Sequence, residues 1–435
     1  MNAFGRKEKN TAEPLGECGL VAQTGDSFQL SETLVEIPPP LRKLKIAIIH
    51  YWFINGLGAE RVTRILAQMF PQADIFTLLA NYDAMPADLK THTVTTSFLQ
   101  NIPGSRRWHR HLLPLYPLAL EQFDLSGYDL VLSAEAGPAK GVITSPRTCH
   151  ICFCHSPMRY LWDMYHSYRA ETGLGSLRRL VFSLSSHYVR LWDLASAQRV
   201  DYYIAISNHV AARIQKFYGR EARVIYPPLR VNGYISQETD DYYLVVSRLV
   251  DYKRVDLAIE ACNRLKRNLR VAGDGEQYKN LKKIAGPTVK FLGFVGDEQL
   301  QSEFARCRAL LFPGEEDLGA TPVEAQSFGR PVIGYARGGV LETVNGVRPG
   351  ERVERFHGGV FFDRPDPESL MDAILAFEDA EGEFCRQAIR DGVLWFGEPR
   401  FRREIYSYIE QKYDEFVNEG SPMAGRVASK VGAVS

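Results

Sequence analysis

Two glutamates around a predicted helix start are the side chains whose types and spacing best suit ligand binding. Glu316 lies in an acidic, glycine-containing loop after an apolar run, and Glu324 follows with seven residues between them. Thr321-Pro322 indicates the helix start, because proline suits the first helical position, so both carboxylates can face one ligand, and each accepts two hydrogen bonds at once. The N–H groups of Leu318, Gly319, Ala320 and Thr321 suit a phosphate or sugar oxygen. Alternatively, Glu324 is only a partner of the helix dipole.

Two cations follow another predicted strand. Arg248 and Lys253 come after the apolar run 242–247 and lie just before the predicted helix 254–266. Cations that converge at a helix N-terminus form a strong site for a diphosphate, and a solvated charged loop is the alternative. No Asp-x-Asp occurs in the chain. We therefore expect no metal cofactor, since these cations could neutralise a diphosphate as a divalent ion does elsewhere.

A glycine-containing turn, Gly56-Leu-Gly58, follows the apolar run 45–50 and precedes a predicted helix. Glycine at such a turn lets backbone N–H groups approach a phosphate or a sugar. Arg61 occupies the place of the third glycine in a dinucleotide-binding fingerprint, so the turn does not predict a dinucleotide site. A plain tight turn is the alternative.

A histidine ends the predicted strand that carries three of the cysteines, Cys149, Cys152 and Cys154. His150, Cys152 and Cys154 would share one strand face, and His155 would point to the other. Because no second ligand pair accompanies them, we expect core cysteines and no zinc site. His155 either reaches a ligand cleft or merely caps its strand.

Strands and helices alternate along the chain and must position these residues. One series of predicted strands lies near 45–50, 74–79, 129–133, 150–155, 202–206 and 223–226, and a second near 242–247, 269–272, 289–292, 309–313 and 332–336. Helices lie between them, which predicts an α/β protein of two doubly wound, Rossmann-like domains facing a cleft. We expect a flexible tail at 1–43, an N-terminal domain at 44–232, a C-terminal domain at 233–400, a helix at 401–418 and a flexible tail at 419–435.

Composition narrows the classes of function. The 435 residues include 52 Lys plus Arg and 52 Asp plus Glu, and this balance argues against a nucleic-acid partner, which would favour a basic excess. No apolar run approaches the roughly 18 residues that span a bilayer. Seven sparse cysteines suit a reducing cytoplasm, and the N-terminus lacks the pattern of a signal peptide.

Taken together, these stretches resemble the family 4 retaining glycosyltransferases, which have the GT-B fold, over roughly residues 44–418. The two glutamates at 316–324 are the most specific sign, and Gly338-Gly339 resembles the family's glycine pair before a helix. Residues 153–163 and 205–208 resemble the N-terminal half of bacterial mannosyltransferases that build O-antigen and exopolysaccharide. Leu57, Leu318 and Ala320 depart from the residues usual in the family.

The resemblance implies a role for each candidate. Arg248 and Lys253 would bind the donor diphosphate, and Glu324 the ribose. Glu316, with the backbone of residues 318–321, would hold the transferred sugar, and His155 would lie over the reaction centre as the second catalytic residue. The remaining implied donor-binding residues are Gly56, Gly58, Ser207, Gly338 and Gly339. The helix 401–418 would return to the first domain.

We therefore expect a metal-independent retaining glycosyltransferase that moves a hexose, mannose from GDP-mannose, to a lipid-linked saccharide in bacterial surface or lipopolysaccharide synthesis. One alternative is a UDP-sugar-dependent transferase of the same fold. Others are a nucleotide-sugar epimerase or phosphorylase, and a non-enzymatic partner subunit. The sequence leaves the base, the sugar, the acceptor and the oligomeric state open.

One stretch of the first domain suggests contact with a membrane surface. Residues 105–117 combine Arg106, Arg107 and Arg110 with Trp108, Tyr116 and three leucines. Basic and interfacial aromatic side chains favour an anionic bilayer surface. We expect a cytoplasmic protein, which contact through this stretch would make peripheral on the cytoplasmic face of the inner membrane. The alternative is a basic loop on a soluble surface with its leucines in the core.

Overall fold

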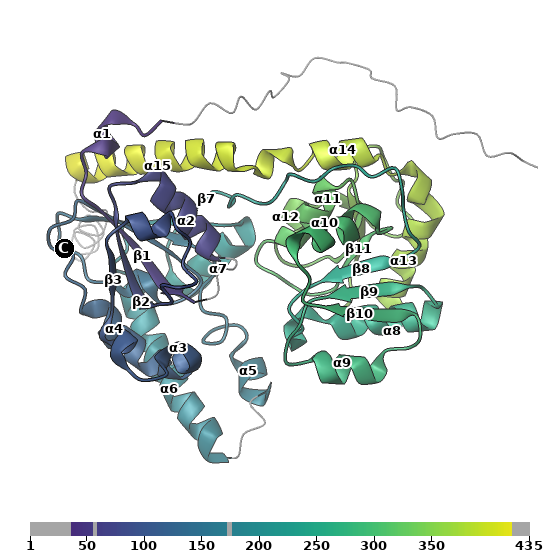
Figure 1. The fold of residues 1–435 in the computed structure, drawn as a ribbon, viewed down its shortest axis with the longest axis horizontal. Helices are drawn as coiled ribbons and strands as arrows, with labels where there is room; N and C mark the ends of the chain where they lie inside the picture. The colour runs from purple at the N-terminus through teal and green to yellow at the C-terminus, as the bar shows by residue number, and fades with distance from the viewer. Residues whose placement is uncertain (1–35, 55–58, 172–175, 420–435) are drawn as a thin grey trace, which may run out of the picture. The chain divides into compact units, whose positions relative to one another are not determined.

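A computed structural model describes residues 36–54, 59–171 and 176–419 of the chain (Figure 1). Its architecture rests on two parallel sheets, each covered by helices. The strands read as short apolar runs because a parallel sheet is buried on both faces.

The first sheet has seven parallel strands in the order β3-β2-β1-β4-β5-β6-β7. The strands are β1 (Ile46–Phe53), β2 (Asp74–Ala80), β3 (Val94–Thr96), β4 (Leu130–Glu135), β5 (Cys149–Cys154), β6 (Tyr202–Ala205) and β7 (Ala222–Val224). The chain first winds from β1 to β3 and then returns to continue from β4, so the order reverses between β1 and β4.

The second sheet also has seven parallel strands, in the order β10-β9-β8-β11-β12-β14-β13. They are β8 (Tyr243–Val246), β9 (Leu269–Ala272), β10 (Val289–Gly293), β11 (Leu310–Phe312), β12 (Val332–Tyr335), β13 (Gly346–Val347) and β14 (Gly359–Phe362). The order reverses between β8 and β11. Both sheets are doubly wound, which confirms the predicted fold class, and we call the chain around them the N-terminal half and the C-terminal half.

Helices follow the strands in both halves. The N-terminal half contains α1 (Pro39–Arg42), α2 (Ala59–Met69), α3 (Ser105–Trp108), α4 (Tyr116–Glu121), α5 (Tyr165–Glu171), α6 (Ser176–Ala197) and α7 (Asn208–Tyr218). The C-terminal half contains α8 (Val255–Leu265), α9 (Tyr278–Ile284), α10 (Asp297–Arg306), α11 (Ala320–Ser327), α12 (Val340–Thr343), α13 (Pro367–Ala380) and α14 (Arg386–Asp391). In the described part of the chain, no helix is both long and apolar enough to cross a membrane.

The terminal helix α15 (Glu398–Glu419) packs on the N-terminal half (Figure 1). Its buried side chains Phe401, Ile405 and Ile409 join the core cluster formed by β1, β5 and β6. The hydroxyl of Tyr406 donates a hydrogen bond to the Met69 carbonyl at 2.7 Å. The last helix of the described residues therefore completes the first core.

Two features differ from the expectations drawn from the sequence. The predicted tail extended to residue 43, but α1 lies inside it, and Leu41 is fully buried in the first core. Three short strands, β3, β13 and β14, were not predicted. β3 and β13 have only three and two residues, too few to show a periodic pattern.

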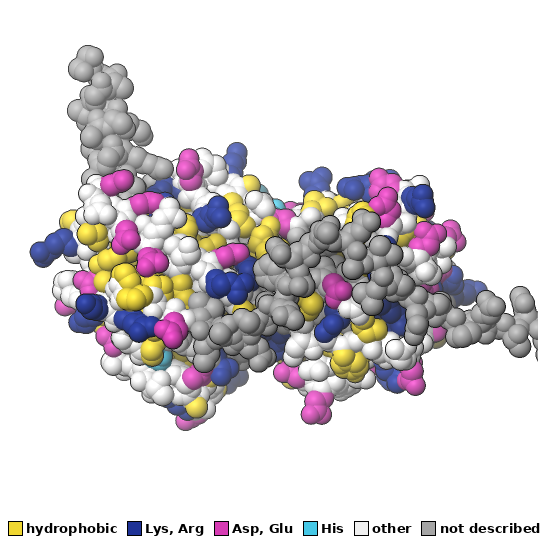
Figure 2. All heavy atoms as spheres, turned by 90° about the horizontal axis from the view of Figure 1, so that it is seen from above, with side chains coloured by type: hydrophobic (Ala, Val, Ile, Leu, Met, Phe, Trp, Pro, Cys, Tyr) yellow, Lys and Arg dark blue, Asp and Glu magenta, His cyan; other side chains and the backbone are white. Residues whose placement is uncertain are grey.

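Charged side chains of both signs are interspersed on the face seen in Figure 2, as the zero net charge of the sequence allows. Two histidines of the described residues, His50 and His150, are fully buried in the interior. His50 Nδ1 lies 2.8 Å from the Ala134 carbonyl, and His150 Nε2 lies 2.9 Å from the Ser133 hydroxyl. Burial lowers the pKa of His50 to about 4 and that of His150 to about 3.

These histidines predict a loss of stability in mild acid. Below pH 6.5 the unfolded chain protonates them, whereas the folded chain does not until the pH reaches their lowered pKa values. The free energy of unfolding should therefore decrease by up to about 1.4 kcal/mol per pH unit for each histidine. Urea unfolding between pH 7.5 and 5 measures this slope. His150→Gln should flatten it, and His111→Gln, at an exposed position, should not. Equal slopes in the two variants would contradict the assignment.

Candidate functional site

The predicted cations lie directly after β8, at the strand where the order of the second sheet reverses. Lys253 ends a short 3₁₀ helix, η5 (Asp251–Lys253), and its ammonium forms a close ion pair with Glu316. Arg248 is exposed, and its Nη2 lies 3.3 Å from the Tyr252 hydroxyl, to which it donates. The structure thus pairs Lys253, which we predicted to bind a diphosphate, with Glu316, which we predicted to bind a sugar. Ligands of doubly wound sheets bind at such reversal points.

The glycine pair holds the loop that carries Glu316. The Gly339 N–H donates to the Glu316 carbonyl at 2.8 Å. Gly338 has a φ of +76°, and a Cβ there would lie 2.4 Å from the same carbonyl oxygen. A Cβ at Gly339 would lie 2.3 Å from the Cα of Leu318. Only glycine permits this approach of backbone to backbone, so the pair fixes where Glu316 and Leu318 lie.

Glu324 occupies the second turn of α11, which begins after Gly319. Gly319 has a φ of +87°, and Ala320 and Thr321 form the first turn. Burial raises the pKa of the Glu324 carboxyl to about 6, although Arg230 and Arg61 act in the opposite direction. Glu324 is therefore a partly desolvated acceptor near neutral pH. Such an environment suits hydrogen bonds from hydroxyl groups.

His155 follows the last residue of β5, at the carboxyl edge of the first sheet. Its Nε2 is buried and has no hydrogen-bond partner among the described residues. Burial lowers the pKa of His155 to about 3, with a further contribution from His50. The imidazole is therefore uncharged at neutral pH. An unpaired buried nitrogen of this kind is suited to a ligand hydroxyl.

Ser207 is fully buried, and its hydroxyl is engaged on both sides. Its oxygen caps α7 by accepting from the Val210 N–H at 3.0 Å. Its proton is donated to the Asp317 carbonyl, at 2.5 Å. The structure thus places Ser207 in the contact between the two halves. Gly56 and Gly58 lie outside the described residues.

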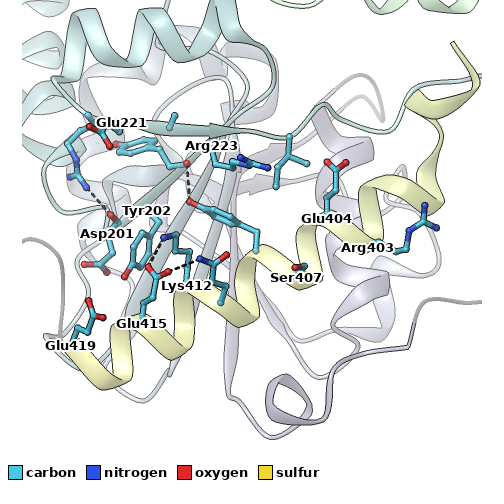
Figure 3. Close-up of a pocket in the computed structure, with 16 residues that line it drawn as sticks. Asp201, Tyr202, Glu221, Arg223, Arg403, Glu404, Ser407, Lys412, Glu415 and Glu419 are labelled. Carbon is cyan, nitrogen blue, oxygen red and sulfur yellow. Dashed lines mark hydrogen bonds and ion pairs between the residues drawn. The ribbon is translucent and has the colours of Figure 1, made fainter. Parts of the chain in front are cut away.

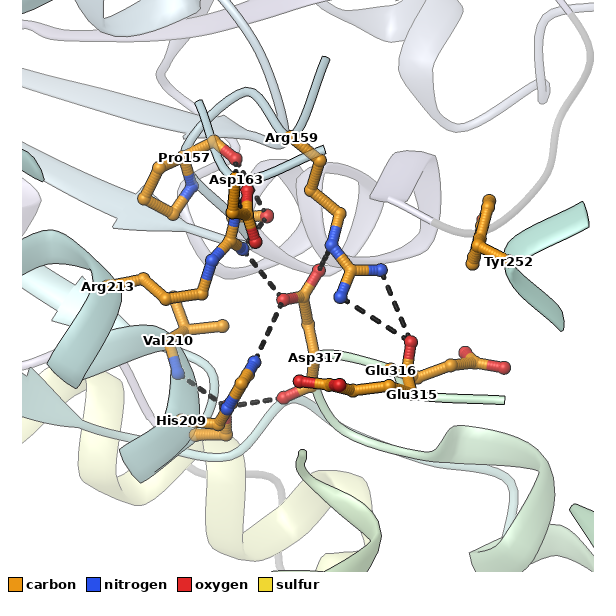
Figure 4. Close-up of polar contacts among 12 residues, drawn as sticks. Pro157, Arg159, Asp163, His209, Val210, Arg213, Tyr252, Glu315, Glu316 and Asp317 are labelled. Atoms are coloured by element: carbon orange, nitrogen blue, oxygen red, sulfur yellow. Dashed lines mark hydrogen bonds and ion pairs between the residues drawn. The ribbon is translucent and has the colours of Figure 1, made fainter. Parts of the chain in front are cut away.

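Asp317 is the residue of this loop that the sequence did not single out (Figure 4). Its Oδ1 accepts from Arg213 Nη1 at 2.8 Å, and its Oδ2 lies 3.6 Å from Arg159 Nε. Arg213 also donates to Asp163 at 2.7 Å and to the Ser156 hydroxyl at 2.5 Å. Both arginines come from the N-terminal half. They bind the loop of the C-terminal half through one carboxylate.

A second carboxylate makes a similar connection. Glu342, in α12, accepts from the backbone N–H groups of Asn208 and His209 at 2.7 and 2.9 Å. The Tyr226 hydroxyl donates to it at 2.8 Å. Glu342 therefore caps the N-terminus of α7, where a negative charge is stabilising. Asp317 and Glu342 of the C-terminal half thus both accept hydrogen bonds from donors of the N-terminal half.

Sequence reasoning had little means of finding these partners. Arg213 lies on a predicted helix and would ordinarily be exposed, yet only 7% of it is exposed here. Asp317 is adjacent to Glu316, and Glu342 follows the glycine pair, so both lay beside recognised motifs. Their partners are more than 100 residues away, a separation that no local pattern reports.

A cavity of about 670 Å³ adjoins the predicted diphosphate site. Arg248, Tyr252, Asp274 and Glu276 line it from the C-terminal half. Aromatic side chains line it from the N-terminal half: Tyr51, Trp52, Tyr116, Tyr160, Tyr168 and Phe182. A cavity bordered by aromatic rings and by a few charged groups is typical of a small-molecule site.

A larger hollow of about 1000 Å³ lies between β6, β7 and α15 (Figure 3). Its lining mixes acidic and basic side chains, among them Arg223, Glu404, Lys412 and Glu415. None of the predicted site residues lines it. The chemistry therefore places the candidate site in the smaller cavity and around the Lys253–Glu316 pair.

Comparison with known proteins identifies the family of the chain. A family model described as Glycosyltransferase Family 4 matches residues 57–232, and one described as Glycosyl transferases group 1 matches residues 232–394. An uncharacterized glycosyltransferase of Methanocaldococcus jannaschii is 24% identical over 77% of this chain and 88% of its own length. The human alpha-1,3/1,6-mannosyltransferase is 28% identical over 43% of this chain and 51% of its own length.

Solved structures show the same fold. A sucrose-phosphate synthase from Thermosynechococcus elongatus superposes with a TM-score of 0.62 at 16% identity, over 86% of this chain and 100% of the other. The Anabaena protein HepE, solved with UDP and glucose, gives 0.60 at 16% identity over 84% and 99%. With the two family models together matching residues 57–394, the chain belongs to the GT-B glycosyltransferases, with an N-terminal half of the family 4 type and a C-terminal half of group 1.

Proposed function

We propose that the protein is a retaining glycosyltransferase that moves a hexose from a nucleotide sugar to a lipid-linked saccharide, with GDP-mannose as the donor. The observation that carries the donor site is the contact between Lys253 and Glu316 beside Arg248, at the reversal point of the second sheet. The partial similarity to a mannosyltransferase supports mannose. The HepE structure holds UDP, so a UDP-sugar donor is the second candidate.

The proposed chemistry is electrostatic. As the bond between sugar and diphosphate breaks, negative charge grows on the leaving group, and Arg248 and Lys253 would stabilise it. Glu316 would hold hydroxyls of the transferred sugar. His155, uncharged at neutral pH, would hydrogen-bond a sugar hydroxyl through Nε2 and would not act as a general acid.

Same-face attack by the acceptor fits the carboxylates better than a double displacement. A double displacement needs a carboxylate nucleophile and a second carboxyl about 5 Å away. Two carboxylates adjoin Glu316 in sequence. The Glu315 side chain is exposed, and Arg213 and Arg159 hold both oxygens of Asp317. Its lone pairs are therefore committed to the loop, and Glu316 is left as the carboxylate facing the sugar.

The aromatic wall of the cavity supports an acceptor from the saccharide class. Tyrosine and tryptophan present an apolar ring with a polar tip, which suits a molecule with both apolar faces and hydroxyl edges. Because Arg248 lines the same cavity, an acceptor on the aromatic wall would meet the donor diphosphate region. A nucleotide-sugar epimerase or phosphorylase on this fold would instead turn over donor without a saccharide acceptor, which product analysis distinguishes.

The cation pair gives the first test of this proposal. Lys253→Ala and Arg248→Ala should each weaken donor binding, because one charge-assisted hydrogen bond contributes roughly 1.5–3 kcal/mol. That corresponds to a loss of about 10- to 150-fold in affinity. Calorimetric titration of GDP-mannose and UDP-glucose measures it and identifies the base. Lys279→Ala, at an exposed lysine of the same half, is the control. Unchanged affinity in both site variants would remove the diphosphate assignment.

The two glutamates should separate turnover from binding. Glu316→Gln should reduce turnover far more than nucleotide affinity, whereas Glu324→Gln should weaken nucleotide binding. Since the pKa of Glu324 is about 6, protonation below that pH removes an acceptor, and affinity of the parent should fall there. The Glu324→Gln variant should lack this pH step. Isothermal titration from pH 7.5 to 5 measures nucleotide affinity, and initial rates measure turnover. If Glu316→Gln weakens nucleotide binding and Glu324→Gln reduces turnover instead, the roles assigned to the two glutamates would be exchanged.

Metal independence is the third expected outcome. Because Arg248 and Lys253 supply positive charge at the diphosphate, transfer should survive chelation with EDTA. Rates measured before and after chelation, and after addition of Mg²⁺ or Mn²⁺, test this. Complete loss with EDTA and full recovery with either ion would show that a divalent cation takes part.

A further inference from the structure

The long helix α6 presents an apolar row to solvent. The members of this row are Leu177, Val181, Leu184, Tyr188 and Leu191, each 51–73% exposed. Leu180 and Leu194, which are also exposed, broaden it. At 1.5 Å per residue the row is about 20 Å long. Figure 1 shows α6 extending past the strands of its sheet. We call this row with its two flanking leucines the α6 face.

The buried side of α6 carries polar side chains, in contrast to an ordinary surface helix. Ser186, Asp193 and Ser196 are buried there, together with Val189. A surface helix normally turns its apolar stripe to the core and its polar side to water. Here the polar side points inward, so the leucines are left outside.

Asp193 fixes this orientation. It forms a close, fully buried ion pair with Lys140. It also accepts from Trp162 Nε1 at 2.8 Å and from the Tyr218 hydroxyl at 2.9 Å. Rotating the helix to cover its leucines would leave a buried charge without its partner, which is strongly destabilising. The apolar face is therefore held outward by the structure.

The described charges that α6 and the stretch 89–120 expose are cationic, and Glu121, which follows that stretch, accepts from Trp192 of α6 and is paired with Arg199. Asp193 is the single carboxylate of residues 176–197, and it is buried. The neighbouring stretch from residue 89 to residue 120 contains no Asp or Glu. Its 3₁₀ helix η3 (His109–Leu115) contacts α6, and Leu113 packs against the buried cluster that contains Val189 of α6. Arg179 on α6 and Arg106 and Arg107 beside η3 are exposed.

Further apolar side chains are exposed on the same neighbouring stretch: Trp108, Leu115 and Leu118. Exposed apolar groups bordered by cations complement an anionic bilayer, where the apolar groups enter the interface and the cations meet lipid headgroups. The spacing of the row, alternately four and three, also resembles a coiled-coil seam. A second copy of α6, however, would bring no exposed carboxylate of its own to pair with these cations.

We propose that the α6 face is a docking surface for an anionic lipid bilayer, with α6 lying in the plane of the interface and residues 105–118 beside it. This deepens the proposed function and rests on it for its purpose, since a lipid-linked acceptor is met at a bilayer surface. The arginine-rich stretch identified in the sequence is the border of this surface, and α6 supplies its apolar area.

Co-sedimentation with vesicles tests the proposal. The full chain should bind vesicles of phosphatidylcholine with phosphatidylglycerol, bind pure phosphatidylcholine weakly, and be released by high salt. The triple variant Leu180→Ser, Leu184→Ser, Leu191→Ser should lose at least about tenfold in partition, because three exposed leucines contribute apolar transfer. All three are exposed, so no cavity is created. The matched control replaces exposed apolar residues elsewhere: Ile284→Ser, Leu375→Ser and Val417→Ser.

Two further measurements separate the outcomes. Donor titration should give equal affinities for the parent and the triple variant, so loss of vesicle binding is distinct from failure of the donor site. Light scattering reports the oligomeric state. Equal vesicle partition by the triple variant, or no binding by the parent, would overturn the proposal. A parent dimer that the triple variant converts to a monomer, without vesicle binding, would assign the α6 face to a second copy.

Discussion

One loop, from Glu315 to Leu318, is held at each residue by a different part of the molecule. Arg159 approaches the Glu315 carbonyl at 3.5 Å, Lys253 pairs with Glu316, and Arg213 binds Asp317. Leu318 is buried in the core cluster of the N-terminal half. The position of Glu316, on which the proposed sugar contact depends, is therefore set by charges on both sides of the site.

This network of ion pairs is partly buried, so its charged groups are partly removed from water. Desolvating an ion pair costs free energy that its own attraction repays only with good geometry and further hydrogen bonds. The Arg213 guanidinium meets that condition, since it donates to two carboxylates, to the Ser156 hydroxyl and to the Pro157 carbonyl. The glycine pair adds a backbone constraint that no other residue type permits. The hydrogen bonds of Arg213 and the glycine pair both hold the loop in one conformation. A flexible loop would lose the alignment of reacting groups that sugar transfer requires.

The Lys140–Asp193 pair acts in the same way at a distance from the donor site. It sets the rotation of α6, and so it decides which side chains of that helix are in contact with solvent. Two carboxylates, the buried Asp193 and the partly exposed Asp317, thus determine which side chains α6 exposes and where the Glu316 loop lies, respectively. In each case a neighbouring carboxylate positions the side chains that we propose to be functional. Asp193 orients the leucines of α6, and Asp317 holds the loop that carries Glu316.

The sequence by itself determined the fold class and the positions of most strands, because buried parallel strands are short apolar runs and the helices between them are periodic. It also singled out Glu316, Glu324, Arg248 and Lys253, because each follows a predicted strand, and the family resemblance implied that they form one donor site. Only the tertiary structure showed that Lys253 pairs with Glu316. It also showed that the Ser207 hydroxyl donates to the Asp317 carbonyl and that Arg213 is buried. It alone showed that the leucines of α6 face outward, because periodicity gives the angle between side chains on a helix and not which side the rest of the chain covers.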